Sequence, residues 1–501
     1  MERILLIQPN MKVATSGQRI VYPPLGIMYI ASVLEQKGYK VRILDCHAEG
    51  LDRDVDMIDG YVDVGIPMDD VRKRIQEFRP DCVGISCNFS VMVASMNETA
   101  KLVKELFPKT AVIVGGNHAS SMPEEVMENP CVDYVMVGES ELTFPMLLNK
   151  IDQGIGFESV PGLVWRKDSG LIKNPPGGYI KDLDSLPMPA WHLFPYEKYS
   201  RTYKPHTVTW GKPEAMPSIL TSRGCAGTCI FCSVHKTMGR KFRARNLDKV
   251  FEEIRFLVDK YHISKLMIVD DNFTHDRKRT KQFCDEFKKY NFGIEIYFQV
   301  LALWCMDEEL IDKLYDIGCT HMGFALESGV QEVLTNIVKK PLKLDRAMEL
   351  LRYAKQKGIH LTGTFVIGFP GETKKDIQRS LYMANYSGLF DSREIYIATP
   401  LPGSEMFDIC KKNNLFVDNF SYSRVEVVKP NITTKDFTPE DIEVILEADR
   451  THHLIKANPK HILRYIKGVW KRKPPLFFKV LWETLKMFVK YDFLKIKEIY
   501  P

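Results

Sequence analysis

Three cysteines with short spacing are the residues in this chain best placed to do chemistry. Cys225, Cys229 and Cys232 lie in the stretch Ser-Arg-Gly-Cys-Ala-Gly-Thr-Cys-Ile-Phe-Cys, a C-x3-C-x2-C pattern that follows the strand-like run 218–221. Three thiolates on one tight loop can hold three irons of a cubane cluster, whereas a fourth cysteine would close it. The spacing therefore predicts an iron–sulfur cluster with one iron left open to an exogenous chelate.

Two other interpretations of these cysteines stay open from the sequence. A structural zinc site usually takes four Cys or His ligands in two pairs, and His235, three residues past Cys232, could supply the fourth. Disulfides are the weaker alternative, because most of the 11 cysteines are scattered among apolar segments and we recognise no signal peptide. Such scattered cysteines are typical of reduced thiols in an intracellular protein, so we expect a cytoplasmic location.

Length and composition set broad limits on the fold. The chain has 501 residues, enough for two or three domains, and its 45% hydrophobic and 27% charged content is ordinary for a globular protein. No run of about 18 apolar residues indicates a spanning helix. The net charge is +5, with Lys and Arg concentrated in the last forty residues. No RNA-recognition pattern occurs, so we expect no nucleic-acid partner.

The first 150 residues alternate between strand-like and helical segments. Helical periodicity covers 25–37, 68–78 and 91–107, and apolar strands are expected at 3–8, 40–44, 82–86, 111–114 and 134–137. This order predicts a doubly wound, Rossmann-like parallel sheet in an α/β fold. Ligands bind such sheets outside the carboxyl ends of the strands, and those ends carry small or polar residues here. They are Asn10, Asp45, Ser86, Gly115, Gly116, Gly138 and Glu139.

The segment 217–405 repeats the alternation in a different form. Helices are expected at 247–261, 279–290, 308–317 and 344–357, and strands follow the cysteine loop at 265–269, 294–302, 321–326, 360–367 and 394–398. With the strand before the cysteines, six βα units predict a partial, TIM-type (β/α)6 barrel. Chemistry in such barrels takes place at the carboxyl ends of the strands. Polar and glycine motifs recur there: Asp270-Asp271-Asn272, Glu327-Ser328-Gly329 and Gly368-Phe369-Pro370-Gly371-Glu372-Thr373.

The cysteine loop, with Phe231 just before its last cysteine, resembles that of the radical S-adenosylmethionine (SAM) superfamily. In that family the open iron of a [4Fe–4S] cluster binds SAM, and one electron cleaves the sulfonium to give a 5′-deoxyadenosyl radical. The Glu-Ser-Gly and Gly-Phe-Pro-Gly-Glu-Thr motifs are similar to later strand ends of the cobalamin-dependent subgroup. The resemblance implies SAM contacts at Phe231 and Arg223 beside the cluster, Asp270, Asp271 and Asn272 near the methionine amino group, Glu327 and Ser328 near the ribose or carboxylate, and Gly368 and Pro370 near the adenine.

Structural roles compete with those contacts. Asp271 and Glu327 could be ordinary helix caps. The run Gly371-Glu372-Thr373 could simply begin the next helix. Arg223 is more simply explained as a group that tunes the cluster or pairs with a carboxylate than as a solvated charge, because its fork matches carboxylate geometry.

The N-terminal strand ends resemble the cobalamin-binding domain that precedes many radical SAM enzymes. The matching pieces are Tyr-Pro-Pro-Leu-Gly at 22–26, Gly-Gly-Asn-His-Ala-Ser at 115–120 and Val-Gly-Glu-Ser-Glu at 137–141. An ordinary nucleotide-type domain is the alternative, since a fold alone does not fix function. The resemblance implies cobalamin contacts at Asn10, Leu25, Gly26, Asp45, Ser86, Gly115, Gly116, His118, Gly138 and Glu139.

A second motif would suggest His47 as a cobalt ligand, but we do not expect this role. Residues 45–50 spell D-x-H-x-x-G, the pattern by which other cobalamin proteins place a histidine on cobalt. In those proteins the motif follows the first strand, whereas here it follows the second. We therefore predict that His47 does not ligate cobalt, while Asp45 hydrogen-bonds the periphery of the cofactor.

The remaining segments connect or flank these domains. Residues 151–216 are predicted to be a linker with a hairpin at 162–173 and an extended proline-rich stretch at 186–191. The region 406–501 is predicted to be helical and basic. From Phe478, apolar residues recur at helical spacing with lysines on the other face. We favour packing of that apolar face on the barrel over contact with an anionic membrane.

Together the two resemblances imply a cobalamin-dependent radical SAM enzyme. Its favoured activity is methylation of an unactivated carbon, with oxidative cyclisation or ring rearrangement as the alternative and a non-catalytic cobalamin or redox sensor as a weaker one. Methylthiotransferases fit less well, because the N-terminal cysteines are too dispersed to hold a second cluster. The implied partners are a small-molecule or lipid-like substrate and an electron donor such as ferredoxin or flavodoxin.

Overall fold

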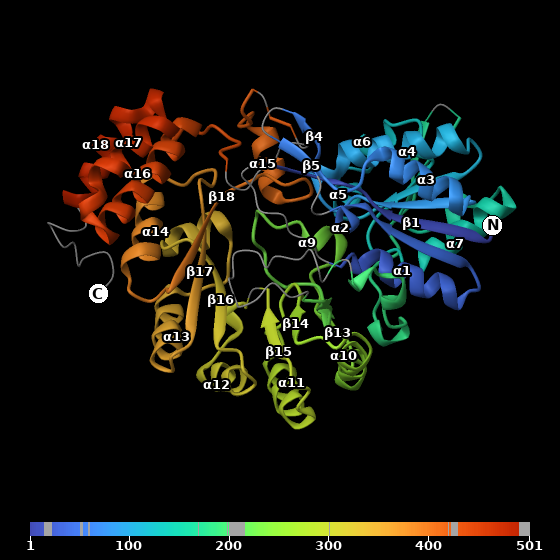
Figure 1. Ribbon diagram of the computed structural model, residues 1–501, viewed down its shortest axis with the longest axis horizontal. Coiled ribbons are helices and arrows are strands. Elements are labelled where there is room, and N and C mark those ends of the chain that lie inside the picture. The colour runs from blue at the N-terminus through green and yellow to red at the C-terminus, as the bar shows by residue number, and fades with distance from the viewer. Residues whose placement is uncertain are drawn as a thin grey trace.

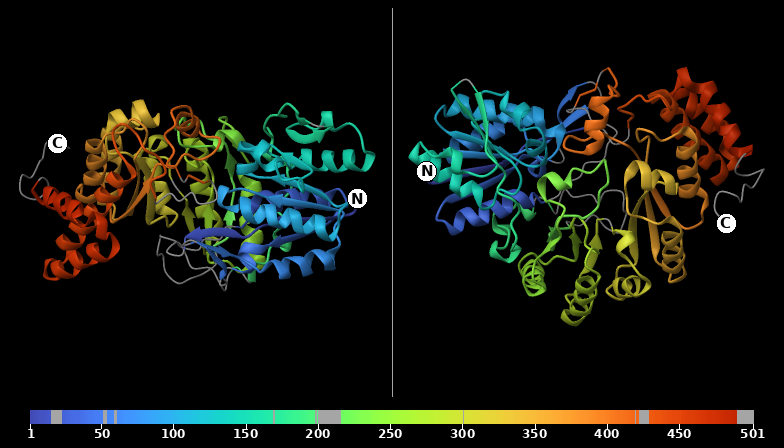
Figure 2. Two further views of the ribbon diagram at one scale, coloured as in Figure 1. Left: turned by 90° about the horizontal axis from the view of Figure 1, so that it is seen from above. Right: turned by 180° about the vertical axis from the view of Figure 1, so that it is seen from behind.

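The computed structural model of the chain describes residues 1–14, 23–50, 54–58, 61–168, 170–197, 199, 216–299, 301–418, 420–421 and 429–489. Three regions follow one another along the longest axis of the molecule (Figure 1): an α/β sheet region, a barrel region and a helical region. The sheet region and the C-terminal helices lie at opposite ends, with the barrel strands between them (Figures 1 and 2).

The N-terminal region is built on a seven-stranded sheet of order β10-β9-β8-β7-β6-β1-β3. Its five parallel strands are β1 (Arg3–Gln8), β3 (Lys40–Asp45), β6 (Cys82–Ser86), β7 (Ala111–Gly115) and β8 (Tyr134–Met136). All five residues of β6 are buried, because helices cover both faces. These helices are α1 (Leu25–Gln36), α3 (Met68–Phe78), α4 (Val93–Leu106) and α7 (Thr143–Gln153). The predicted doubly wound α/β fold is confirmed.

The hairpin predicted at 162–173 forms and belongs to the same sheet. Its strands are β9 (Leu163–Lys167) and β10 (Gly170–Lys173), and β9 pairs antiparallel with β8. Asp168 in the turn has a φ of 53°, a left-handed conformation that Asp tolerates better than most residues. The hairpin therefore extends the N-terminal sheet by two strands.

A smaller antiparallel sheet was not predicted from the sequence. It has the order β2-β5-β4, with β2 at Met11–Ala14, β4 at Asp54–Ile58 and β5 at Tyr61–Val64. The short helices α2 (Cys46–Glu49), α5 (Asn117–Ser121) and α6 (Pro123–Met127) also went unpredicted. Elements of four or five residues are too short to show a clear hydrophobic period.

The central region is an open arc of six parallel strands. These are β11 (Ser218–Ile219), β14 (Lys265–Ile268), β15 (Glu295–Phe298), β16 (His321–Glu327), β17 (His360–Ile367) and β18 (Ser392–Ile397). They form two three-stranded sheets, and a parallel bridge between Leu301 and Phe324 joins them. The outer helices are α10 (Leu247–Tyr261), α11 (Arg277–Tyr290), α12 (Glu308–Asp316), α13 (Leu344–Gln356) and α14 (Lys374–Tyr386). The predicted six-unit partial barrel is confirmed.

Three longer helices form the C-terminal region: α16 (Pro439–Ala457), α17 (Ile462–Arg472) and α18 (Phe477–Met487). Helix α18 buries Val480, Thr484 and Met487. The apolar stripe that starts at Phe478 faces outward instead, with Phe478 78% and Trp482 61% exposed. Our preference for packing of that stripe on the barrel was therefore wrong. None of the helices among the described residues combines the length and the apolar run needed to cross a membrane.

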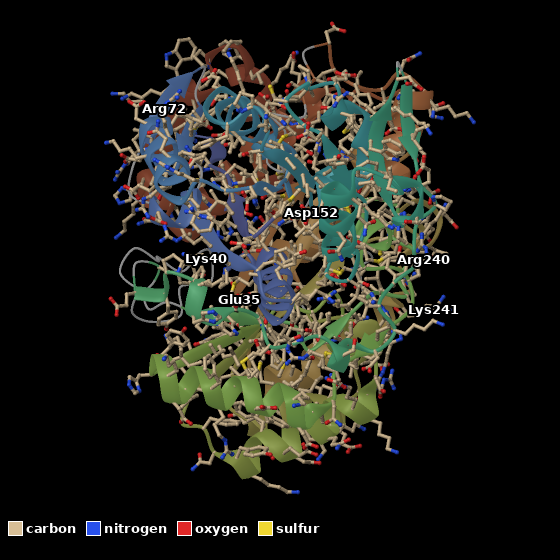
Figure 3. The ribbon with its side chains drawn as sticks, turned by 90° about the vertical axis from the view of Figure 1, so that its right-hand side faces the viewer. Glu35, Lys40, Arg72, Asp152, Arg240 and Lys241 are labelled. Atoms are coloured by element: carbon tan, nitrogen blue, oxygen red, sulfur yellow. The ribbon has the colours of Figure 1, made fainter. Side chains whose placement is uncertain are left out.

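The sheet region and the barrel meet along a broad boundary. Viewed from the side of the sheet region, Glu35 near the end of α1 and the pair Arg240 and Lys241 lie along it (Figure 3). A carboxylate oxygen of Glu35 lies 3.1 Å from Nε2 of His192, the residue that follows the proline-rich segment. Trp191 next to it is buried and donates its indole N–H to Glu253 of α10, at 2.9 Å. The proline-rich segment thus ties the first helix of the sheet region to the first helix of the barrel.

Candidate functional site

The cysteine loop follows β12 (Ser222–Arg223) and is held on both sides by main-chain hydrogen bonds. The amide of Cys225 donates to the carbonyl of Gly239, at 3.2 Å. The amide of Ile230 donates to the carbonyl of Val338, at 3.0 Å, and the carbonyl of Ile230 accepts from Met406. All three cysteines are partly exposed, whereas Ile230 between them is buried. The loop is thus an anchored segment whose three cysteines stay partly accessible.

The sulfurs of Cys225 and Cys229 face a common space beside Gly227. The amide of Gly227 donates to Cys225 Sγ at 3.4 Å, and a methyl group placed on Gly227 would lie 3.3 Å from that sulfur and 3.9 Å from Cys229 Sγ. Burial raises the pKa of the Cys229 thiol to about 12 and also raises that of Cys232. A cationic metal centre is what converts such thiols to thiolates.

The donor set fits an open cubane better than a zinc ion. Within the described ranges, no three His, Cys, Asp or Glu side chains converge closely enough to hold a single metal ion. The His235 side chain hydrogen-bonds the backbone of Cys232. Because a cubane distributes its protein ligands over separate irons, three sulfurs spread around a loop suit a cluster that leaves one iron open.

Two adjacent carboxylates after β14 fix the base of the cysteine loop. Asp270 accepts hydrogen bonds from the Thr221 amide, the Thr221 hydroxyl and the Ser222 hydroxyl, each at 2.6 Å. Asp271 accepts one from the Gly224 amide at 2.8 Å. Burial raises the pKa of Asp270 and raises that of Asp271 to about 6. These two residues therefore position the segment that leads into Cys225. Their neighbour Asn272 is buried and donates to Cys305 Sγ.

Glu327 lies at the end of β16 in a strained conformation with a φ of 69°. Its carboxylate is paired with buried Lys340 at 2.8 Å, and the Lys340 ammonium lies 4.8 Å from the centre of the Trp304 ring. Ser328 is buried, and its hydroxyl is 3.0 Å from that of Ser380 on α14. Glu327 is thus not a helix cap. It places a buried ion pair close to the cysteines.

The loop after β17 is held by a buried carboxyl group. Glu372 accepts hydrogen bonds from the amides of Gly368 and Phe369, at 2.6 and 3.0 Å, and Thr373 caps α14. Burial raises the pKa of Glu372 to about 8, so this group is mostly protonated at neutral pH. The ring of Phe369 packs 5.8 Å from that of Phe231. The loop that carries Gly368 and Pro370 is therefore fixed next to the cysteine loop.

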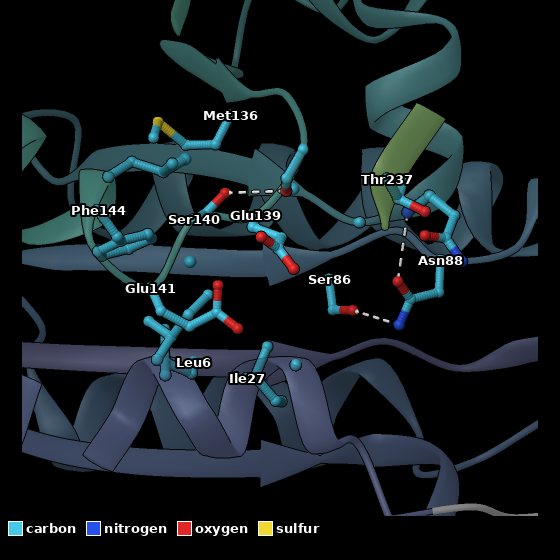
Figure 4. A pocket seen from close by; sticks show the side chains of 18 of the residues that line it. Leu6, Ile27, Ser86, Asn88, Met136, Glu139, Ser140, Glu141, Phe144 and Thr237 are labelled. Carbon is cyan, nitrogen blue, oxygen red and sulfur yellow. Dashed lines mark hydrogen bonds between the residues drawn. The ribbon is translucent and has the colours of Figure 1, made fainter. Parts of the chain in front are cut away.

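The strand ends of the sheet region surround a pocket that reaches under the adjacent helix α1 (Figure 4). Leu6, Met136 and Phe144 lie at its apolar end, and Ser86 and Asn88 at its polar end, with Glu139 and Glu141 between them. Its lining includes these predicted residues: Gly26, Ser86, Gly115, Gly116, Gly138, Glu139 and Arg223. A methyl group on Gly26 or Gly138 would meet no atom within 4 Å, so both leave the pocket open.

Four other residues predicted to contact cobalamin lie outside the lining of this pocket: Asn10, Leu25, Asp45 and His118. Asp45 caps α2 by accepting from the Ala48 amide, and burial raises its pKa to about 7. His118 is buried, its Nδ1 is 3.0 Å from the Ser90 hydroxyl, and burial lowers its pKa to about 4. His47 is also buried, on α2.

Arg223 connects the pocket to the cysteine loop. It is 4% exposed and pairs with Glu139 at 3.0 Å and with Glu141 at 2.7 Å, while its guanidinium lies over the ring of Tyr29. Arg243 makes a second ion pair with Glu139, at 2.8 Å. Burial opposes the charge of Arg223, but Glu141 and Glu139 outweigh it and raise its pKa. Arg223, two positions before Cys225, thus pairs with carboxylates that follow strand β8 of the sheet region.

Sequence reasoning missed several residues at this site: Glu141, Arg243, Trp304, Lys340 and Glu372. Glu141 and Glu372 stood inside motifs that were recognised, so their motif positions were the available signal. Arg243 and Lys340 reach the site from segments distant in sequence, and nothing in their local pattern separates them from surface cations. Trp304 lies after β15 in a short 3-10 turn.

Two sequence families match the chain. The B12 binding domain family matches residues 13–148, and the Radical SAM superfamily matches residues 219–383. The chain is 34% identical over 449 residues to cytidylyl-2-hydroxyethylphosphonate methyltransferase of Streptomyces wedmorensis, and the matched residues cover 83% of each protein. It is 28% identical over 437 residues to anaerobic magnesium-protoporphyrin IX monomethyl ester cyclase of Rubrivivax gelatinosus, covering 85% of this chain and 73% of the relative.

Solved structures share the whole arrangement. The cobalamin-dependent S-adenosylmethionine radical enzyme OxsB, with aqua-cobalamin and S-adenosylmethionine bound, superposes with a TM-score of 0.72 at 14% identity over 99% of this chain and 75% of that one. At these identities the likeness concerns the fold: a sheet region, a barrel region and a C-terminal region in one chain.

Proposed function

Because the chain belongs to the cobalamin-dependent radical SAM enzymes, we propose that it transfers a methyl group to an unactivated carbon of its substrate. When bound, its cofactors, a [4Fe–4S] cluster, SAM and cobalamin, would supply two things: a radical able to remove a hydrogen atom from the substrate carbon, and a methyl group for transfer to that carbon. Such a carbon is a poor nucleophile, so a methyl cation donor alone does not alkylate it. The protein contributes binding, orientation and exclusion of water.

The residues of the chain divide this work between its two regions. Cys225, Cys229 and Cys232 hold the cluster. The fixed loops with Asn272, Glu327 and Gly368 surround SAM, and the pocket at Gly26, Gly115 and Gly138 takes part of cobalamin. The apolar end of that pocket suits a flat organic group, and its glycines allow close approach of the main chain. In this proposal the cobalamin domain spans 1–150, the barrel 217–405 and the helical region 406–501, and the connecting segment 151–216 adds its β9–β10 hairpin to the sheet of the first domain.

The observation that carries the proposal is the Arg223 ion-pair cluster. Reaction between a radical formed at one cofactor and a methyl group held at another requires the two sites to be held in fixed register. Arg223 provides that connection, since it is the last residue of β12, at the base of the cysteine loop, and its guanidinium pairs with Glu139 and Glu141. A domain that merely sensed cobalamin would not need this connection to a cluster loop.

Oxidative ring closure or rearrangement is the alternative within the same family, favoured by the relatedness to the anaerobic cyclase. Methyl transfer is preferred because the methyltransferase is the more similar of these two relatives in sequence, and the two matches cover nearly equal shares of this chain. We further propose that the enzyme acts in the cytoplasm on a small-molecule or lipid-like substrate. Its reductant is a low-potential carrier such as ferredoxin or flavodoxin, and it makes peripheral contact with a membrane.

The test uses anaerobically reconstituted full-length protein, cell extract as the source of substrate, and SAM labelled in its methyl group. Methyl transfer predicts 5′-deoxyadenosine together with label in an extracted product. A Cys229→Ala variant is the matched control and loses both. Deoxyadenosine without label in any product supports the cyclase alternative, and formation of neither contradicts an enzymatic role.

A further inference from the structure

Helix α18 exposes a continuous apolar stripe on the side opposite its packing contacts. Phe478, Trp482 and Leu485 are 78%, 61% and 53% exposed, and Val489 continues the same spacing. Positions i, i+4, i+7 and i+11 lie on one side of a helix. The buried residues Val480, Thr484 and Met487 occupy the other side. Single exposed apolar residues are normal, but an aligned set with two large aromatic rings indicates a docking surface.

Helix α17 extends this surface. Leu463 and Trp470 are 79% and 53% exposed, whereas Val469 is buried. The rings of Trp470 and Phe477 pack edge to face with centroids 5.1 Å apart, and Phe477 contacts Phe478 with centroids 5.3 Å apart. Aromatic contacts thus run from one helix to the other. We define the α17–α18 face by its exposed apolar residues, which are Leu463, Trp470, Phe478, Trp482, Leu485 and Val489.

A row of cations borders this face. Lys460, Arg464, Lys467 and Lys471 follow one another along α17 and its preceding turn at spacings of four, three and four, which places them on one side of the helix. All four are exposed, and no ion pair joins any of them to a carboxylate among the described residues. The neighbouring cations differ, because Lys473 and Lys479 are paired with Glu443 and Glu440 on α16. Among the described residues, the outer edge of α17 therefore carries four cations without a carboxylate partner.

We propose that the α17–α18 face docks on the surface of an anionic lipid bilayer. Helices that lie in a membrane interface combine Trp, Phe and Leu on one side with Lys and Arg along the polar edge. Lys and Arg can reach the lipid headgroups while their aliphatic stems cover apolar surface, and Trp is suited to the headgroup depth. A row of four cations that no described carboxylate pairs with matches a negative surface. Docking of this kind depends on α17 and α18 alone and not on the proposed chemistry.

Flotation of full-length protein with vesicles tests the proposal. The protein is expected to float with vesicles of phosphatidylcholine and phosphatidylserine, not with phosphatidylcholine alone, and to be released by high salt. The double variant Lys467→Gln and Lys471→Gln lowers the partition coefficient about 30-fold. The matched control, Lys278→Gln with Lys289→Gln on α11, removes the same charge from another exposed helix and leaves binding unchanged.

A second pair of variants tests the apolar contribution. Trp482→Ser is expected to weaken binding to the anionic vesicles, whereas Ile155→Ser, 70% exposed in the sheet region, is not. Circular dichroism checks that both variants stay folded. Equal flotation with neutral and anionic vesicles, or equal behaviour of the face variants and their controls, overturns the proposal. So does concentration-dependent self-association that Trp482→Ser abolishes in protein that does not float, because the face then binds a second copy.

Vesicle binding and catalysis are separate readouts. The flotation assay needs neither cluster nor cobalamin, so apoprotein and reconstituted protein are both suitable. Flotation without any methyl transfer supports the docking face and contradicts only the proposed reaction. Methyl transfer by protein that never floats supports the proposed reaction and contradicts the docking face.

Discussion

The strand ends of the two α/β regions are built on opposite principles. In the sheet region they carry Gly115, Gly116 and Gly138, and these residues line an open pocket. In the barrel they carry Asp270 and Asp271, with Glu372 in the loop after β17, and these side chains accept hydrogen bonds from the chain itself. The strand ends of the sheet region leave space for a ligand. Those of the barrel instead hold their own loops in place through hydrogen bonds.

The difference shows that a polar residue at a strand end is not by itself a ligand contact. Both carboxylate oxygens of Asp270 are occupied by Thr221 and Ser222, so its effect on the site passes through the cysteine loop. A glycine at a strand end acts through the space it leaves. Arg223 belongs to both arrangements, because it stands at the base of the cysteine loop and lines the pocket. Substitutions at these positions should therefore differ in how they divide between stability and cofactor binding.

The largest expected effect on stability comes from Arg223→Ala. The change leaves Glu141 buried without its cation, and Glu139 keeps only Arg243. Removing one partner of a buried pair costs about 3–5 kcal/mol of unfolding free energy. Urea unfolding measures this loss. The control is Arg346→Ala, an exposed pair partner on α13 whose loss costs about 0–1 kcal/mol. Equal effects of the two variants would show that the two regions do not depend on this ion-pair cluster.

A smaller loss is expected from Asp270→Ala. Three donors lose their acceptor, so we expect about 2–3 kcal/mol from unfolding measurements, against about 1 kcal/mol for Asp271→Ala, which frees one donor. Iron content after anaerobic reconstitution should fall in the same order, because Asp270 anchors more of the loop that leads to Cys225. The reverse order would mean that Asp271 contributes to the site directly rather than by positioning the loop.

Much of the fold was predictable because apolar runs are local. The strand 82–86 and the strand 360–367 were predicted with the bounds that the structure shows, since 82–86 is largely apolar and ends at Ser86, and 360–367 lies between Gly358 and Gly368. The pocket glycines were predictable for the same reason, because a strand end fixes which residue faces the ligand side. The small β2-β5-β4 sheet was not predictable, because β2 pairs with β5 across about fifty positions.

Long-range partners account for the rest of what sequence reasoning missed. The pairing of Arg223 with Glu141 depends on how the barrel lies against the sheet region, and no local pattern encodes that. The apolar stripe of α18 was recognised from the sequence, but the prediction that it packs on the barrel was wrong. The outcome depended on α16, against which the helix buries Val480 and Met487 rather than Trp482. Amphipathic spacing predicts that a face exists, and the neighbouring elements decide which face is covered.

The smallest effect on stability, paired with a clear effect on cofactor binding, is expected from Gly26→Leu. Gly26 lies in the first turn of α1 with open space where a side chain would go, so leucine fits and favours the helix by about 0.5–1 kcal/mol. The side chain enters the pocket, however, and such overpacking should weaken cobalamin binding about tenfold or more. The absorbance of cobalamin retained after gel filtration measures this.

Gly170→Leu, at the exposed start of β10 in the β9–β10 hairpin, is the matched control and should retain cobalamin. Iron content should stay unchanged in both variants, because neither touches the cysteine loop. Full cobalamin retention by Gly26→Leu would show that the pocket under α1 does not serve that cofactor. The contrast between open strand ends in the sheet region and occupied ones in the barrel would then describe packing alone, since the space left by the glycines would have no ligand to receive.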